Sequence, residues 1–222
     1  MSNIVNAFKL PNPGPALCLM AGHGATHWMI GVFYVLLPFV REDYGFSYTQ
    51  IGFLLAAFEA GVLVCSLASG PVVDMTGRRV IFQVLALVVG GLAMLALAVS
   101  PDIFFFCVMA ALVGGATQFW HAPATAFLSF YYTTNWGYVV GIHGMGANIG
   151  EAIGPLIAGV VITTFGWQMG ALVPAVASIV AAIALFVLLL PKDTPGDGEK
   201  AKGLTLGQYF DGFAGLLKNF GV

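Results

Sequence analysis

Six long apolar stretches constrain this chain more than any other feature of its sequence. Each has about the 20 residues that an α-helix needs to cross the hydrocarbon core of a bilayer. The connections between them are short, and backbone groups cannot stay unpaired in lipid, so neighbouring stretches should form antiparallel helical hairpins. The sequence therefore predicts an all-α membrane protein, a bundle of six transmembrane helices. The stretches cover about residues 17–40, 49–70, 80–99, 102–126, 138–164 and 168–190.

Charged side chains are too scarce for a water-soluble surface. Of 222 residues, 59% are hydrophobic and 8% are charged, and the mean hydropathy is +0.92. A soluble domain normally has about 25% charged residues, so the lipid bilayer is the expected surrounding of the chain. The net charge of −2 also excludes nucleic acid as a partner, because binding to a phosphate backbone needs a basic patch.

The positive charges predict how the bundle is oriented. An even number of spans places both termini on one side of the membrane. That side would carry seven of the eight Lys and Arg residues, and the other side only Arg41. Because cytoplasmic segments carry the excess of Lys and Arg, both termini are predicted to be cytoplasmic. The seven residues are Lys9, Arg78, Arg79, Lys192, Lys200, Lys202 and Lys218.

The same boundaries divide the chain into three regions. Residues 1–16 would form a cytoplasmic N-terminus, residues 17–190 the six-helix transmembrane bundle, and residues 191–222 a cytoplasmic linker with an amphipathic helix. That helix is predicted from apolar residues at helical spacing, with polar residues elsewhere on the helix. The apolar residues are Leu206, Tyr209, Phe210, Phe213, Leu217 and Phe220.

The connection between the second and third stretches contains Gly70, Asp74, Gly77, Arg78 and Arg79. Glycines permit a tight turn, and an acid with two arginines can form a charged latch between helix ends. The spacing resembles the cytoplasmic signature of the major facilitator superfamily, which stands after the second helix of six. The resemblance assigns these five residues to a cytoplasmic gating motif. An ordinary positively charged cytoplasmic loop is the alternative.

A second resemblance lies in the fifth stretch, where glycines recur. The pattern is similar to a motif of the superfamily's antiporters, although Ala158 stands where that motif has glycine. A generic packing stripe is the alternative, because small residues at every fourth position, here Gly146, Gly150 and Gly154, let another helix approach closely. The residues that match the antiporter motif are Gly141, Gly150, Gly154, Pro155 and Gly159.

More narrowly, the chain resembles the fosmidomycin-resistance branch of the superfamily. The resemblance is carried by residues 46–52, at the entry to the second helix, and by residues 119–123 in the fourth. Members have two six-helix halves that hold the substrate between them, so this chain would be the N-terminal half. The second half would come from the same chain if this one is truncated, from a separate chain, or from a second copy. The resemblance also implies a multi-pass protein of the bacterial inner membrane, the plasma membrane.

Polar side chains inside the apolar stretches are the candidates for a substrate or proton site. A charged group at mid-bilayer costs about 2.5–3.5 kcal/mol on insertion scales, so each needs a reason. Histidine titrates near physiological pH, and a partly desolvated carboxylate can also exchange protons. For any single residue, a hydrogen bond to a neighbouring helix is the alternative role. The candidates are His23, His27, Glu59, Gln118, His121 and Glu151.

Together these patterns predict secondary active, proton-coupled transport of a small organic solute by alternating access. The alternative is a non-transporting six-helix scaffold or assembly subunit of a larger membrane complex. We expect no enzyme and no cofactor, because no nucleophile elbow or phosphate loop is recognisable. We expect no metal site either: His23 and His27, four residues apart, could bind an ion, but the sequence indicates no third ligand.

Overall fold

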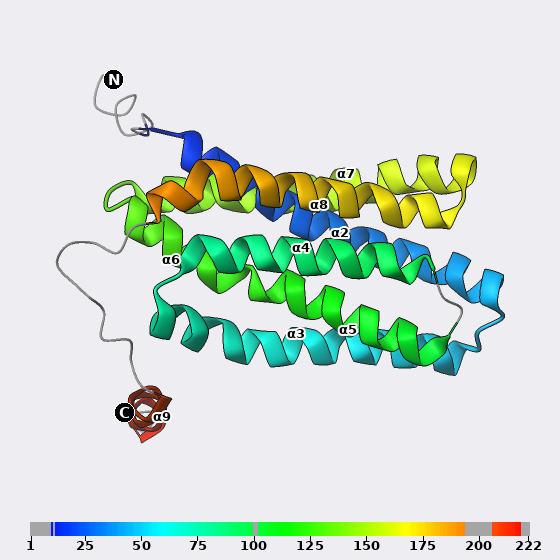
Figure 1. Cartoon of the computed structure of the whole chain (residues 1–222), viewed down its shortest axis with the longest axis horizontal. Coiled ribbons are helices and arrows are strands. Elements are labelled where there is room, and N and C mark those ends of the chain that lie inside the picture. The colour runs from blue at the N-terminus through cyan, green and yellow to red at the C-terminus, as the bar shows by residue number, and fades with distance from the viewer. Residues whose placement is uncertain (1–9, 11, 100–101, 194–205, 219–222) are drawn as a thin grey trace.

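The computed structural model describes residues 10, 12–99, 102–193 and 206–218. Within these residues all regular structure is helical, and six helices are long and apolar enough to cross a membrane. Figure 1 shows them running side by side along the long axis of the molecule. The prediction of an all-α six-helix bundle is therefore confirmed.

The six spans follow the predicted stretches with small shifts at their ends. A short 3₁₀ helix, η1 (Leu190–Lys192), continues the last span, and α9 (Leu206–Lys218) follows later in the chain. In Figure 1 α9 is seen end-on, so it runs across the direction of the six spans. Its predicted place at the membrane interface stays a prediction. The spans are α2 (Gly14–Tyr44), α3 (Tyr48–Thr76), α4 (Arg79–Leu97), α5 (Ile103–Phe119) with α6 (His121–Tyr131), α7 (Trp136–Phe165) and α8 (Trp167–Leu189).

Local sequence signals mark the helix ends. The Ser47 hydroxyl accepts a hydrogen bond from the Gln50 backbone N–H, and the Gln50 side chain accepts one from the Ser47 N–H, a capping box that begins α3. The Asp102 carboxylate caps α5 by accepting from the Phe105 N–H. At the other end of α3, Gly77 adopts a left-handed conformation with φ 65°, which glycine reaches without strain. The connections between spans are short because such caps end the helices sharply.

The end of α3 corrects one expectation. The segment from Gly70 to Arg79 was expected to be a connection between helices, yet α3 continues through Pro71 to Thr76. Asp74 therefore lies in the last turn of a helix, and only Gly77 and Arg78 separate α3 from α4. The stretch of apolar residues stops before the helix does, because a helix can continue past the hydrocarbon into water.

The regular helix of the fourth span is interrupted at Trp120, which separates α5 from α6 although its own backbone stays helical (φ −54°, ψ −39°). Pro123 follows three residues later and has no N–H, so the carbonyl of Phe119 loses its usual helical partner. The Gln83 side chain of α4 donates a hydrogen bond to the Pro123 carbonyl oxygen. The break places His121 at the first residue of α6, in the middle of the span.

Helix pairing follows a regular pattern. The most extensive contacts join α2 to α7 and α3 to α5, followed by α4 with α8. If the first three spans are matched in order to the last three, the first corresponds to the fourth and the second to the fifth. The contact of α2 with α7 then corresponds to the contact of the fourth span with α3. This is the pairing expected of two three-helix repeats, the arrangement nested within each half of a major facilitator.

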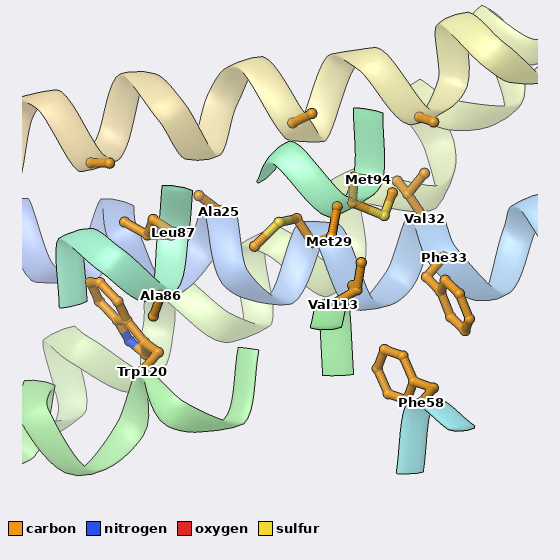
Figure 2. Packing of buried hydrophobic residues seen from close by; sticks show 14 of the residues in the cluster. Ala25, Met29, Val32, Phe33, Phe58, Ala86, Leu87, Met94, Val113 and Trp120 are labelled. Carbon is orange, nitrogen blue, oxygen red and sulfur yellow. The ribbon is translucent and has the colours of Figure 1, made fainter. Parts of the chain in front are cut away.

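The centre of the bundle is apolar. Phe33 of α2 stacks on Phe58 of α3 with ring centroids 4.7 Å apart, and Met29 of α2 and Met94 of α4 both belong to the buried apolar cluster (Figure 2). Trp120 is fully buried at the break in the fourth span. Large apolar side chains also cover the outside, as on α8, where lipid would contact them; these include Val180, Ile183, Val187 and Leu188.

Candidate functional site

All four histidines of the chain lie together inside the bundle. His23 and His27 come from α2, His121 from the start of α6 and His143 from α7. The His23 ring stacks on that of His143 with centroids 4.0 Å apart, and lies 4.6 Å from the His27 ring and 5.2 Å from the His121 ring. Three separate segments thus build one imidazole cluster, hereafter the histidine cluster.

Glycines bring α7 close enough to α2 for these contacts. A Cβ atom on Gly146 would fall on the carbonyl oxygen of Met20, and one on Gly150 on that of Gly24. Only glycine therefore permits the observed distance between the two backbones. His143 and Glu151, which flank these glycines on α7, are carried against His23 and His27 on α2.

The His27–Glu151 pair joins the histidine cluster to the outside of the bundle. The His27 Nδ1 atom lies 2.7 Å from the Glu151 Oε1 atom. The side chain of His27 is 17% exposed and that of Glu151 is 55% exposed. A polar side chain without a partner is costly in a membrane span, and this contact gives each of the two side chains a partner. The pair gives the cluster an acidic group at its open side.

The other two anchored rings contact backbone oxygens. His23 Nδ1 lies 2.9 Å from the carbonyl oxygen of His143, and His121 Nδ1 lies 3.3 Å from that of Gln118. The Gln118 side chain itself donates to the Ser66 hydroxyl on α3 at 3.4 Å. Gln118 therefore contacts the histidine cluster through its backbone carbonyl. Its side-chain amide instead links α5 to α3.

Glu59 forms a second, separate polar contact. Its Oε1 atom accepts a hydrogen bond from the Tyr34 hydroxyl at 3.0 Å, which links α3 to α2. Tyr34 also lines an open groove of about 740 Å³ between these helices, together with Arg41, Glu42 and Tyr48. The groove therefore extends from Arg41, near the end of α2, to Tyr34, the hydrogen-bond partner of Glu59.

Comparison with known proteins assigns the fold to a family. Residues 19–219 match the family model described as Major Facilitator Superfamily, which covers most of the chain. The chain belongs to the Major Facilitator Superfamily. The resemblance seen in the sequence is thereby confirmed at the level of the superfamily.

Several relatives of known name are similar to the chain. It is 28% identical over 158 residues to the 4-hydroxybenzoate transporter PcaK of Acinetobacter baylyi, covering 71% of this chain and 34% of the relative. It is 27% identical to the gallate transporter of Pseudomonas putida (73% of this chain, 36% of the relative) and 23% identical to the hexuronate transporter of Bacillus subtilis (71% and 37%). The chain spans about a third of the length of these relatives.

Membership of the superfamily, bacterial relatives and six apolar helices together place the chain in the bacterial plasma membrane as a multi-pass protein. This confirms the localisation predicted from the sequence. The orientation of the termini is a separate question, and the cytoplasmic assignment stays a prediction.

The superfamily's cytoplasmic motif is arranged differently from the expected latch. Arg79 forms an ion pair with Asp193 at 3.4 Å and lies over the Phe130 ring, 4.1 Å from its centroid. The Asp193 carboxylate also accepts a hydrogen bond from the Val80 N–H at 2.8 Å, which caps the start of α4. Asp74 and Arg78 are exposed, and no ion pair of Asp74 occurs within the described ranges. The gating role of the motif stays a prediction.

Asp193 was missed by sequence reasoning, which placed it in a linker. A signal was available: it is the first acid after the sixth span, at the end where Arg78 and Arg79 are expected. His143 was not among the candidates selected from the sequence. Only its stacking on His23 shows that it belongs to the histidine cluster.

The antiporter-like motif of α7 divides into two groups. Gly150 and Gly154 face α2, where a Cβ on Gly154 would lie 2.8 Å from the Cδ1 atom of Trp28. Gly141 and Gly159 would have room for a side chain, since nothing lies within 4 Å of a Cβ built there. The glycines at every fourth position therefore serve helix packing in this structure.

One tyrosine outside the spans closes the end of the bundle at which α2 begins. Tyr132 follows α6, and its hydroxyl donates a hydrogen bond to the Asn12 carbonyl oxygen and accepts one from the Ala16 N–H. Burial raises the pKa of Tyr132 above its ordinary value. The hydroxyl therefore keeps its proton at physiological pH and holds the start of α2 against the turn before α7.

Proposed function

We propose that the chain forms the N-terminal six-helix half of a proton-coupled secondary transporter of small organic acids that works by alternating access. A second six-helix unit would cover the open side of the histidine cluster. In this arrangement the cluster and Glu151 line the substrate path, and Glu59 carries the coupled proton.

The observation that carries this proposal is the exposure of two acids inside membrane spans. Glu59 and Glu151 are both exposed on the bundle, although each lies within an apolar helix. Lipid against these side chains would cost several kcal/mol. Acids at this depth are expected where a protein surface or a water-filled cavity faces them, as between the two halves of a superfamily transporter.

The substrate class is proposed from the names of the relatives. 4-Hydroxybenzoate, gallate and hexuronate, the solutes in those names, each bear a carboxylate at neutral pH. We therefore propose a small organic acid. The narrower resemblances, to the fosmidomycin-resistance branch and to antiporters, stay predictions of the sequence.

Glu59 is the acid best suited to take up and release a proton. Within the described part of the chain its partner is the neutral Tyr34 hydroxyl, and no Lys, Arg or His lies at ion-pair distance. A carboxylate without a cationic partner is costly in an apolar span unless water reaches it. The opening and closing of a transporter would change that access to water.

Uptake measurements test the proposal. In the source organism, cells with the gene deleted would be compared with cells that carry it in its native coding context, using labelled 4-hydroxybenzoate and an imposed pH gradient. We expect uptake that depends on the gene and on the gradient. Glu59→Gln, which cannot exchange the proton, should lower gradient-driven uptake at least about tenfold.

Glu42→Gln is the matched control, because Glu42 is exposed at the end of α2 and should tolerate the same change. Gene-dependent uptake that Glu59→Gln leaves intact would contradict the role of Glu59. If deletion changed the uptake of no organic acid, the transport proposal would fail and the scaffold alternative would be favoured.

A further inference from the structure

Three imidazoles of the histidine cluster place ring nitrogens close to one another. One ring nitrogen from each of His23, His27 and His121 lies within 4.8 Å of the corresponding atoms of the other two. His23 is 7% exposed, whereas His27 and His121 are partly buried. The missing third ligand of the α2 pair is thus supplied by α6, from the break in the fourth span. We propose that these three histidines bind a divalent transition-metal ion of the Zn²⁺ type.

Hydrogen bonding prepares the rings for this role. In each ring the Nδ1 atom faces an oxygen: the Glu151 carboxylate for His27, and the carbonyl oxygens of His143 and Gln118 for His23 and His121. Those oxygens accept, so Nδ1 carries a proton, and in the neutral ring Nε2 then keeps its lone pair. Metal-binding histidines are commonly held in this way, with the second ring nitrogen donating to a carboxylate or a backbone carbonyl.

The free nitrogens have no other role in the described structure. The Nε2 atoms of His23 and His27 are buried and have no hydrogen-bond partner. A buried nitrogen without a partner costs about 1–3 kcal/mol, and here two belong to rings whose centroids lie 4.6 Å apart. A metal ion bound to these lone pairs would remove that cost.

The geometry suits a small ion after a modest adjustment. Zn²⁺ binds imidazole nitrogen at about 2.0–2.1 Å in tetrahedral sites, which places the ligand nitrogens about 3.4 Å apart. The observed upper limit of 4.8 Å requires side-chain rotations that bring the rings inward by about 1 Å. Imidazole ligands favour zinc, copper, nickel and cobalt, whereas magnesium and calcium prefer oxygen ligands.

Three protein ligands leave a fourth position open, as in zinc sites that bind water or a small ligand. The partly exposed His27–Glu151 pair marks the side from which an ion would enter. The carboxylate would balance part of the charge of the ion and hold the His27 ring. This inference is independent of transport, because it concerns the binding of an ion to the resting protein.

Metal binding can be measured directly on the purified protein in detergent. The protein would carry a streptavidin-binding tag, since a histidine tag would add competing imidazoles. After removal of metal it would be titrated with Co²⁺, whose visible absorption reports tetrahedral coordination, and then with Zn²⁺. We expect one Co²⁺ per chain, displaced by Zn²⁺. Absence of stoichiometric binding would overturn the proposal.

Variants identify the ligands. Loss of a residue that supports a ligand typically weakens metal binding by about ten- to hundredfold. Glu151→Gln should weaken binding within that range. His121→Gln, which removes a ligand, should weaken it more. Glu42→Gln, at the exposed end of α2, is the matched control and should bind as the wild type does. Replacing Cys18, Cys65 and Cys107 together by alanine should also leave binding intact. Binding that survives His121→Gln and His27→Gln, or that is lost with the cysteines, would overturn the assignment.

A measurement on the unaltered protein avoids dependence on the folding of variants. X-ray absorption of the Zn²⁺-loaded wild type should show imidazole nitrogens at about 2.0 Å. A thiolate shell, or oxygen ligands alone, would overturn the proposal. Transport is not measured in any of these experiments, so their failure would leave the uptake proposal standing.

Discussion

At the scale of single residues, position on α7 decides what a glycine does. Gly150 lies against the carbonyl oxygen of Gly24, whereas Gly141 faces open space. Both belong to the same sequence motif, so the motif alone does not separate them. The difference comes from the neighbouring helix, and it can be measured.

Gly150→Ala should destabilise the protein, because the new methyl group would overlap the α2 backbone. Overpacking of this kind costs about 1–3 kcal/mol, which should lower the midpoint of thermal unfolding in detergent. Gly141→Ala is the matched control. It should leave the midpoint unchanged or raise it, since alanine is favoured over glycine in a helix by up to about 1 kcal/mol. Equal midpoints for both variants would show that α2 and α7 are not packed as described.

At the scale of the elements, the start of α4 depends on a residue 113 positions later in the chain. Asp193 follows η1, yet its carboxylate accepts from the Val80 N–H and pairs with Arg79. An acid at a helix N-terminus satisfies an unpaired N–H and complements the helix dipole. The contact fastens the end of the sixth span to the start of the third.

Asp193→Ala should therefore lower stability by about 1 kcal/mol from the lost cap, with a further loss from the broken ion pair. Thermal unfolding in detergent would measure the change. Asp74→Ala, at the end of α3, provides the comparison, since a change at an exposed site usually stays within about 0.5 kcal/mol. A larger effect at Asp74 than at Asp193 would mean that the latch forms as the sequence first suggested.

At the scale of the whole molecule, orientation is a consequence of charge. One end of the bundle carries Arg78, Arg79 and Lys192, and the other carries Arg41, whose guanidinium lies 3.9 Å from the centroid of the Tyr48 ring. The excess of cations predicts the cytoplasmic end. The groove beside Tyr34 is therefore predicted to open at the opposite, non-cytoplasmic end, because Arg41 lines that groove.

Reporter fusions would test this orientation. Alkaline phosphatase fused after Gly45 should be active, because it folds only outside the cytoplasm, and the same reporter fused after Gly77 should be inactive. Green fluorescent protein at these positions should give the opposite pattern. Activity after Gly77 together with inactivity after Gly45 would reverse the predicted topology.

The six spans could be predicted because hydropathy alone determines them. About 20 apolar residues cross the bilayer whatever they pack against, and the superfamily motif between Gly70 and Arg79 identified the fold class. The candidate site was predicted as a set of polar residues without their contacts. His23 and His27 were paired from their spacing on one helix, and His121 and Glu151 were selected separately.

Only the tertiary structure decided which of these residues meet. In lipid, the packed face and the outer face of a helix are both apolar, so the sequence carries little periodic signal of which helix lies against which. The contact of α7 with α2, the addition of His121 and His143 to the α2 histidines, the Tyr34 partner of Glu59 and the cap from Asp193 all depend on that missing information. Hydrocarbon determined that six helices form, and close packing through glycines determined how they are arranged.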